Sequence, residues 1–360
     1  MNDIKDCFGQ SSIVDMPTTE LTIRSLAKKN SDYAVFSTPG HKGELSRTDL
    51  TEYDGGRIFP QDSIERAEQR VAKRYGAKYA KFSVCGSSMA IKAAIVAVDS
   101  DIIAPVLTHR AVEEGATLIK RRVHFFDTGS DGSLPATPIA SHYEQAIKNH
   151  PECKLAVLTH PDYFGRGANL LKIKEVCQKY GVLLLIDSAH GAHFATRPQV
   201  FTAGAEKCAD FATVSTHKTL RSLTQTAIGF CNNDEYAERW KKAFELLGTT
   251  SPSYELLASI EGGIEYEDKH ADYYDTLIEF RKKINDEFGF AVMQNWDYMR
   301  LVMCSPDGNG ETLFNELVKR KIMPETYFKE YCIMILTLSD KKEKLDALYR
   351  AFKEIYNEKR

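Results

Sequence analysis

Short, wholly apolar runs alternate with amphipathic segments along most of this 360-residue chain. The runs Leu155–Thr159, Val182–Ile186 and Phe211–Val214 have strand length, and helical periodicity marks intervening segments such as Leu170–Tyr180. A strand that is apolar at nearly every position is buried on both faces, so helices must cover both sides of its sheet. The sequence therefore predicts an α/β fold with a mostly parallel sheet and helices on both faces.

The overall composition narrows the class of protein. Lysine and arginine number 47 against 50 aspartates and glutamates, a formal net charge of −3, which gives no support for binding nucleic acid or an anionic membrane. The first residues lack the apolar core of a secretion signal, and no apolar run is long enough to span a bilayer, so a cytoplasmic protein is expected. The eight cysteines stand singly, so neither a disulfide framework nor a metal site is expected.

Two of the predicted strands end in side chains that can carry chemistry. Asp187 follows the run Val182–Ile186, and Lys218 follows Phe211–Val214 within the polar segment Ser215–Leu220. Open α/β sheets bind ligands at the carboxyl ends of their strands, where both residues are expected. A lysine amine becomes a nucleophile when burial or a nearby cation lowers its pKa. The pair therefore predicts a pyridoxal phosphate (PLP) site, in which Lys218 forms a Schiff base and Asp187 faces the pyridinium nitrogen.

The same residues lie in motifs that resemble those of the bacterial ornithine/lysine/arginine decarboxylases, which have the aspartate aminotransferase fold. The similar stretches are Thr38–Gly43, Ser215–Leu220 with Leu223–Gln225, and Asp187–Phe194, where Ser188 replaces the usual glutamate. The resemblance spans roughly Pro17 to the C-terminus. It implies the fold type I of PLP-dependent transferases: a large domain with a mostly parallel sheet of the seven-stranded type, and a small α+β C-terminal domain. Longer members carry a further C-terminal domain, which this chain is expected to lack.

The resemblance also divides the chain into expected parts. An N-terminal arm and loop take up residues 1–60, with one helix near Thr19–Lys28, and the large PLP-binding domain takes up residues 61–252. An interdomain helix over residues 253–288 leads into the small C-terminal domain, residues 289–360. The small domain is expected to run strand, strand, helix, strand, helix.

Further site residues follow from the resemblance. The turn Gly86–Ser88 opens an apolar helix and matches the family's phosphate cup, because N–H groups at a helix N-terminus bind anions, although an ordinary serine N-cap also explains it. His109 matches the histidine that stacks on the outer face of the PLP ring, opposite Ala189. His217 is expected to donate to the phosphate and to assist proton delivery. The expected catalytic set is Lys218, Asp187, His109 and His217, and the expected cofactor-binding set is Gly86, Ser87, Ser88, His109, Asp187, Ala189, His190, Ser215, His217, Lys218, Thr250 and Ser251.

Five of the candidate residues keep two interpretations. His190 has either a supporting role or a direct one. Thr250 and Ser251 match a turn that reaches the PLP phosphate of the neighbouring subunit, which implies a homodimer with shared active sites, but they also suit a helix N-cap. Arg300 is either structural or a substrate-carboxylate ligand, and a two-point salt bridge there would favour transamination. Glu325 either meets a basic side chain near the substrate entrance or is simply exposed.

The resemblance implies one reaction above the others. This is PLP-dependent decarboxylation of a basic amino acid, lysine, ornithine or arginine, which releases CO2 and a polyamine-type amine. An aminotransferase or a lyase on the same fold is the alternative. A member that binds PLP without turnover is a third hypothesis, against which the intact His109, Asp187 and Lys218 argue. No chemical role is predicted for His41 or Lys42.

Overall fold

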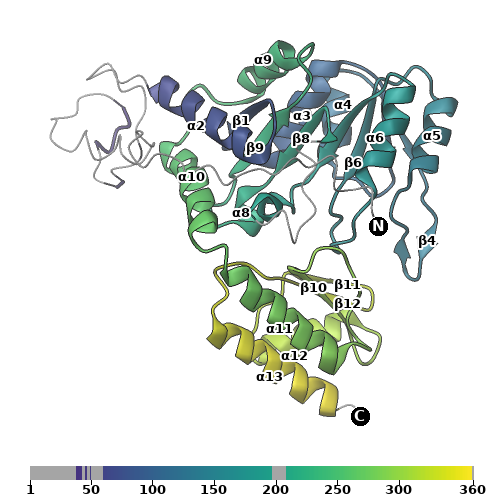
Figure 1. The fold of residues 1–360 in the computed structure, drawn as a ribbon, viewed down its shortest axis with the longest axis vertical. Coiled ribbons are helices and arrows are strands. Elements are labelled where there is room, and N and C mark those ends of the chain that lie inside the picture. The colour runs from purple at the N-terminus through teal and green to yellow at the C-terminus, as the bar shows by residue number, and fades with distance from the viewer. Residues whose placement is uncertain (1–37, 43–44, 47–48, 50–59, 197–207, 359–360) are drawn as a thin grey trace.

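The computed structural model describes residues 38–42, 45, 46, 49, 60–196 and 208–358. At its centre lies a seven-stranded sheet in the order β1–β9–β8–β7–β6–β2–β3 (Figure 1). Strand β9 runs antiparallel to both of its neighbours, and the other pairings are parallel. The mostly parallel sheet is confirmed, while the helix predicted near residue 19 lies outside the described residues. The strands are β1 (Tyr79–Ser83), β2 (Ile102–Pro105), β3 (Val123–Phe126), β6 (Leu155–Thr159), β7 (Leu183–Asp187), β8 (Phe211–Val214) and β9 (Ala227–Cys231).

Helices cover both faces of this sheet. In strand β6, the side chains of Leu155 and Val157 pack against the helices on one face, while those of Ala156 and Leu158 pack against the helices on the other face. Successive side chains of a strand point to opposite faces, so a five-residue strand serves two cores. The helices on the first face are α3 (Gly86–Val98), α4 (Ala111–Leu118) and α9 (Ala237–Leu247). The helices on the second face are α2 (Pro60–Tyr75), α5 (Ala140–Asn149), α6 (Leu170–Lys179) and α10 (Tyr254–Lys269).

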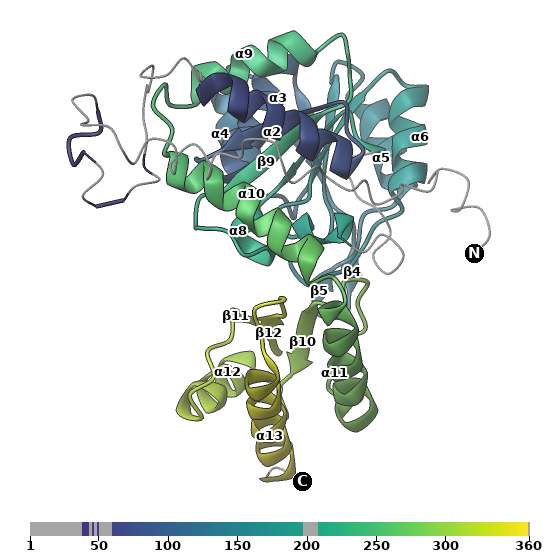
Figure 2. The same ribbon diagram turned by 60° about the vertical axis from the view of Figure 1, so that its left-hand side comes forward.

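A second, smaller unit follows α10, as Figure 2 shows. Its antiparallel sheet has the order β10–β12–β11, and helices pack on one face of it. The observed order is strand, helix, strand, strand, helix, which differs from the predicted order. A strand was predicted before β10, but this stretch forms only an isolated bridge, between Val292 and Met303. The elements are β10 (Arg300–Cys304), α12 (Gly310–Lys319), β11 (Thr326–Phe328), β12 (Tyr331–Ile335) and α13 (Lys342–Glu358), together with the preceding α11 (Tyr273–Phe288).

The predicted interdomain helix is two helices, α10 and α11, with a turn at residues 270–272 between them. The turn redirects the chain from one core to the other. Tyr254 and Leu257 of α10 pack in the core of the large sheet, whereas Leu277 and Ile284 of α11 pack on the small sheet. One straight helix would place both sets along a single line and leave one core uncovered. Within the described residues, none of the helices has the length and apolar character needed to cross a lipid bilayer.

The two sheets are joined by the loop that follows β6. Phe164 of this loop packs against Val302 and Ile333 of the small sheet. Leu134 completes the contact from a short hairpin, β4 (Ser130–Asp131) and β5 (Leu134–Pro135). Since Phe164 is buried by residues of both units, the loop fixes where the small sheet lies relative to the large one.

Gly165, the next residue, sets how closely the segment before β10 approaches this loop. Its carbonyl oxygen accepts the N–H groups of Trp296 and Asp297 at 3.0 and 2.8 Å. Its φ is +78°, and an added Cβ would lie 2.7 Å from Cβ of Arg300 and 2.8 Å from Nδ2 of Asn295. Glycine is therefore required here both for the left-handed backbone and for the close contact.

We expect Gly165→Ala to lower the free energy of unfolding by more than the backbone conformation alone explains. The left-handed conformation costs about 1–2 kcal/mol for a residue with a Cβ. Forcing the new methyl group against Arg300 adds about 1–3 kcal/mol. The matched control is Gly129→Ala, where φ is +75° and no atom lies within 4 Å of the added Cβ. Urea unfolding of both variants measures the difference, and equal losses would contradict the proposed close contact.

Candidate active site

Four strands of the large sheet deliver their last residues, or the residues just after them, to one edge. Gly86 follows β1, His109 follows β2, Asp187 ends β7, and Lys218 lies in α8 (Thr216–Thr219), directly after β8. This is the carboxyl edge, where the sequence places the candidate residues and where open α/β sheets bind ligands. The hydroxyl of Ser215 donates to that of Ser87 at 2.9 Å, and this bond joins the Lys218 segment to the start of α3.

The N-terminus of α3 has the properties of an anion site. Cys85, at the N-cap position, makes no side-chain capping bond, so the helix's first N–H groups are not used in that way. Gly86 has a φ of +74°, no atom lies within 4 Å of where its Cβ would be, and its N–H donates to the carbonyl of Gln225 at 2.7 Å. The hydroxyl of Ser87 accepts from Ser215, which leaves its own proton for another acceptor. A phosphate group fits this donor set.

Asp187 is the buried carboxyl group of the site. Its side chain is 4% exposed, and one oxygen accepts the N–H of Ala189 at 3.1 Å. Burial raises the pKa of Asp187, and the nearby amine of Lys218 acts in the opposite direction. A carboxyl group in this position fits a partner that brings its own positive charge or proton, such as a ring N–H.

Lys218 and Arg300 contact opposite nitrogens of one imidazole, that of His190. The Nη2 atom of Arg300 lies 2.6 Å from Nδ1, and Nζ of Lys218 lies 3.2 Å from Nε2. A guanidinium group can only donate, so Nδ1 of His190 must accept, and the single ring proton must be on Nε2. The Nε2–H group then donates to Lys218, and an amine can accept a hydrogen bond only when it is uncharged.

This hydrogen-bond assignment agrees with the electrostatics of the site. Burial lowers the pKa of Lys218, Asp187 opposes that effect, and the charge of Arg300 adds to it. Burial also lowers the pKa of His190, again with help from Arg300. The lowered pKa of Lys218 favours its uncharged, nucleophilic form, and the Nε2–H group of His190 positions that form. His190, whose role the sequence leaves open, lies in direct contact with Lys218.

Arg300 enters the site from the small sheet. It begins β10 on the same face as Val302, which packs on Phe164, so the alternation of the strand turns it towards the large sheet. Its side chain is 1% exposed, and its Nε and Nη1 atoms have no hydrogen-bond partner among the described residues. Buried donors without partners are costly, so these two atoms fit an acceptor supplied by a ligand. The guanidinium also lies 5.6 Å from the ring centroid of Tyr163.

Tyr163 connects Arg300 with Glu325. Its hydroxyl donates to Oε1 of Glu325 at 3.2 Å, and its ring meets that of His190 edge-on at 5.3 Å between centroids. Burial raises the pKa of Tyr163 to about 12, with a further contribution from Glu325, so the phenol keeps its proton. Glu325 itself is exposed at the rim of the group. The structure thus gathers Arg300 and Glu325 around Lys218.

The remaining predicted residues differ in where they lie. His217 is half-buried and its Nδ1–H donates to the carbonyl oxygen of Thr226 at 2.8 Å. His109 is exposed, and its Nδ1 accepts the N–H of Ala111 at 3.2 Å. Thr250 and Ser251 are exposed in the segment between α9 and α10. No hydrogen bond among the described residues joins these last two to the Lys218 group.

Sequence reasoning missed the buried residues that support Arg300. His193, in the 3₁₀ helix η2 (Ala192–Ala195), pairs with Asp297 at 3.1 Å between Nε2 and Oδ1, and both side chains are 1% exposed. The carbonyl of Asp297 accepts the N–H of Arg300 at 3.0 Å. The available sequence signal was a spacing of three residues. It separates His190 from His193, and it also separates Asp297 from Arg300.

His160 was also missed. It follows β6, is 3% exposed, and its Nδ1 accepts the N–H of Ala168 at 3.1 Å. Its ring lies 4.8 Å from that of Trp296. Burial lowers the pKa of His160 to about 4, so the ring is neutral and serves packing.

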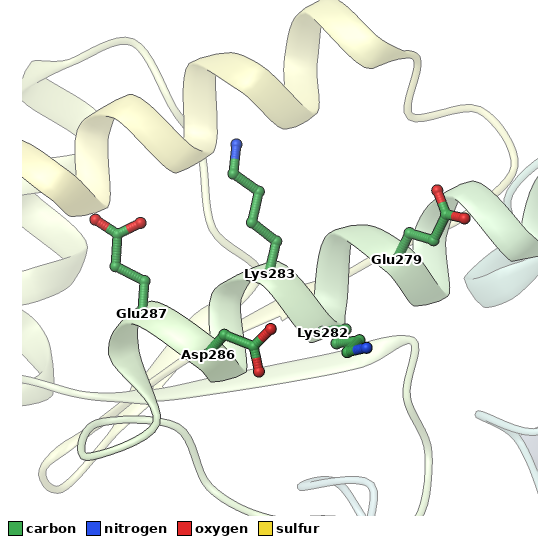
Figure 3. A pocket seen from close by; sticks show the side chains of 5 residues that line it. All are labelled: Glu279, Lys282, Lys283, Asp286 and Glu287. Atoms are coloured by element: carbon green, nitrogen blue, oxygen red, sulfur yellow. The ribbon is translucent and has the colours of Figure 1, made fainter.

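A hollow on α11 lies away from this group of residues. Figure 3 shows Lys283 reaching towards α13 from one wall of the hollow. Its Nζ lies 3.4 Å from the ring centroid of Tyr349, whose hydroxyl donates to Glu287. These contacts pair Lys283 and Glu287 of α11 with Tyr349 of α13, so they join two surface helices. The lining residues are Glu279, Lys282, Lys283, Asp286 and Glu287.

Solved structures identify the fold. The chain superimposes on the lysine decarboxylase LdcF of Francisella novicida with a TM-score of 0.77 at 18% identity, covering 93% of this chain and 60% of that one. It superimposes on a structure of SPT with PLP with a TM-score of 0.67 at 15% identity, covering 81% and 76%. The fold is that of the PLP-dependent enzymes of fold type I, as predicted.

Sequence comparison then gives the family. Residues 28–302 match the family described as "Orn/Lys/Arg decarboxylase, major domain", so the chain belongs to this family. An arginine decarboxylase from Halalkalibacterium halodurans is 33% identical over 210 residues, which are 56% of this chain and 42% of that protein. The chain therefore spans less than half of that relative. The resemblance to the decarboxylase family is confirmed.

We expect Arg300→Met and His190→Phe each to raise the pKa of Lys218. The first removes a positive charge and the second removes the donor that stabilises the uncharged amine. A shift on the order of one pH unit, or ~1.4 kcal/mol, is expected. The pH dependence of amine labelling in the cofactor-free protein, followed by mass spectrometry, measures it, with exposed Lys282 as internal reference. Exposed Arg239→Met is the matched control, and unchanged profiles in both site variants would refute the assignment.

Proposed function

We propose that this protein is a PLP-dependent decarboxylase of a basic amino acid, lysine, ornithine or arginine. The observation that carries the proposal is the amine of Lys218 in contact with His190 and near the buried carboxyl group of Asp187. Membership of the Orn/Lys/Arg decarboxylase family supports the reaction, and the arginine decarboxylase and lysine decarboxylase among its relatives support the substrate class.

The residues of the site suit PLP group by group. The N-terminus of α3, with Gly86, Ser87 and Ser88, holds the phosphate, and Lys218 binds the aldehyde. Asp187 faces the ring nitrogen and stabilises its proton. When bound, PLP supplies an electron sink for the electron pair that remains at Cα after CO2 leaves. His109 and Ala189 would contact the ring, and Ser215 and His190 would complete the set of residues that hold the cofactor.

His217 contributes to the phosphate site in one protonation state. Its Nδ1–H is used by the carbonyl oxygen of Thr226, so only Nε2 remains for a ligand. Nε2 donates only when the ring is an imidazolium. We therefore assign Nε2 of His217, and not Nδ1, to the phosphate.

Proton transfer falls to Lys218. Replacement of CO2 at Cα requires one proton, which Lys218 would take from the α-ammonium group of the incoming substrate and return at Cα. The Nε2–H group of His190, 3.2 Å from Nζ, would position the amine for both transfers. Arg300 keeps the ring of His190 in the tautomer that presents this N–H. The positioning of Lys218 therefore depends on both neighbouring side chains.

The rim of the site carries the specificity for a basic side chain. Glu325 is an exposed carboxylate, and its position is fixed by the hydroxyl of Tyr163 at 3.2 Å. An ammonium or guanidinium group at the end of a substrate side chain fits beside it. Charge-assisted hydrogen bonds of this kind contribute about 1.5–3 kcal/mol.

A second candidate function is transamination. It rests on the free Nε and Nη1 atoms of Arg300, which suit a carboxylate held by two parallel hydrogen bonds. A carboxylate fixed there favours loss of the Cα proton instead of CO2. The two reactions differ in their products, an amine with CO2 in one and a 2-oxo acid in the other.

We expect the holoprotein to release labelled CO2 from one basic amino acid in a panel of carboxyl-labelled lysine, ornithine, arginine, glutamate and leucine. Lys218→Ala is the blank and should lose both activity and the absorption of the lysine-bound cofactor. Glu325→Gln should raise KM for that substrate about 10-fold, or ~1.4 kcal/mol, because one charge-assisted contact is lost. Formation of a 2-oxo acid without CO2 would favour the transaminase, and release by Lys218→Ala would overturn the cofactor site.

We also propose a homodimer with shared active sites. Thr250 and Ser251 are exposed and do not reach the Lys218 group of their own chain, which leaves them for a neighbouring subunit. We expect sedimentation equilibrium to give twice the chain mass. A mixture of Lys218→Ala with a Thr250→Val, Ser251→Ala double variant should recover activity, because mixed dimers contain one intact site. A monomer with full activity would contradict the proposal.

A further inference from the structure

Two histidines and two carboxylates meet at the amino edge of the large sheet, opposite the candidate active site. Asp101 precedes β2, His124 lies in β3, and His150 and Glu152 lie between α5 and β6. Three segments that are distant in sequence thus bring four metal-ligating side chains to one place. The proposed decarboxylation leaves these residues without a role, because its residues stand at the carboxyl ends of the strands.

The distances in this cluster match those between ligands of a four-coordinate ion. Oε1 of Glu152 lies 3.6 Å from Nε2 of His124 and 3.5 Å from Nδ1 of His150. The three ligand atoms all lie within 4.8 Å of one another. With metal–ligand bonds near 2.0–2.2 Å, the corners of a tetrahedron are about 3.3–3.6 Å apart. The ligand atoms are therefore close enough to share one ion once the stacked imidazole rings turn so that their nitrogens converge.

We propose that His124, His150 and Glu152 bind a divalent transition-metal ion of the zinc class. Imidazole and carboxylate ligands suit such an ion, and three protein ligands leave a fourth position for water. Asp101 is not included as a ligand. Its Oδ2 atom, which lies 3.4 Å from Nε2 of His124, is paired with Nη2 of Arg122 at 3.0 Å. Its carboxylate contacts the same Nε2 atom of His124 that would bind the ion, so it contributes a nearby negative charge and not a hydrogen bond to the other ring nitrogen.

One further feature of the surroundings favours a cation here. His150 is the C-cap of the ten-residue helix α5, and the partial negative charge at a helix C-terminus attracts positive ions. The rings of His124 and His150 lie 3.9 Å apart between centroids, so both imidazoles are present at this helix end.

Cys153, the residue after Glu152, is not a ligand. Its side chain is 1% exposed and packs in the core of the large sheet. The site is therefore made of nitrogen and oxygen ligands, which separates it from metal binding by the free thiols elsewhere in the chain.

The test is metal titration of the holoprotein, freed of any polyhistidine tag and of unbound PLP. We expect Zn²⁺ to bind with a stoichiometry near one per chain by calorimetry and to raise the thermal midpoint. Co²⁺ should give the visible bands of a tetrahedral complex with nitrogen and oxygen ligands, without the charge-transfer band of a thiolate. The absence of saturable binding, or a thiolate spectrum, would overturn the proposal.

Variants assign the site to its residues. His124→Ala and Glu152→Gln should each weaken Zn²⁺ binding by at least about 10-fold. The exposed His270→Ala, at the end of α10, is the matched control and should bind as the natural protein does. Circular dichroism and the thermal midpoint without metal show whether each variant is folded. Unchanged binding in both folded site variants would refute the assignment, and CO2 release without added metal should be unaffected in all three.

Discussion

The candidate site depends on one constraint: the guanidinium of Arg300 can only donate hydrogen bonds. Because Nδ1 of His190 must accept from it, the ring proton is fixed on Nε2, and the amine of Lys218 meets a donor instead of an acceptor. The hydrogen bonding of the lysine thus depends on a residue of a different sheet, through a single imidazole. The buried pair of His193 and Asp297 holds the start of β10 where this contact is possible.

The sequence was most informative where local pattern and burial agree. The apolar strands predicted the parallel sheet, and motifs at strand ends predicted that Gly86, Asp187 and Lys218 would share one edge. Those predictions hold because the carboxyl ends of parallel strands are adjacent whatever the loops do. The continuity of the interdomain helix and the order of elements in the small unit differ from the prediction, since both depend on where the second sheet docks.

Other parts of the structure could not be read from the sequence. The contact of His190 with Arg300 joins residues 110 positions apart, and no spacing rule relates them. The expectation that the chain offers no metal site rested on isolated cysteines, and it did not weigh the two histidines and one carboxylate, from two separate segments, on which the proposed metal site is based. In both cases the chemistry is assembled by packing between elements, which leaves no local signature.

The alternation of side chains along β10 has a consequence for how the small sheet can assemble. Arg300 and Val302 face the large sheet, whereas Leu301 and Met303 face the helices of the small unit. A slip of one residue against β12 would exchange these sets. An unpaired guanidinium would then enter an apolar core while a leucine replaced it beside His190. The residue on which the hydrogen bonding of the lysine depends thereby also selects the register of its own strand, so a misassembled small unit would be both unstable and inactive.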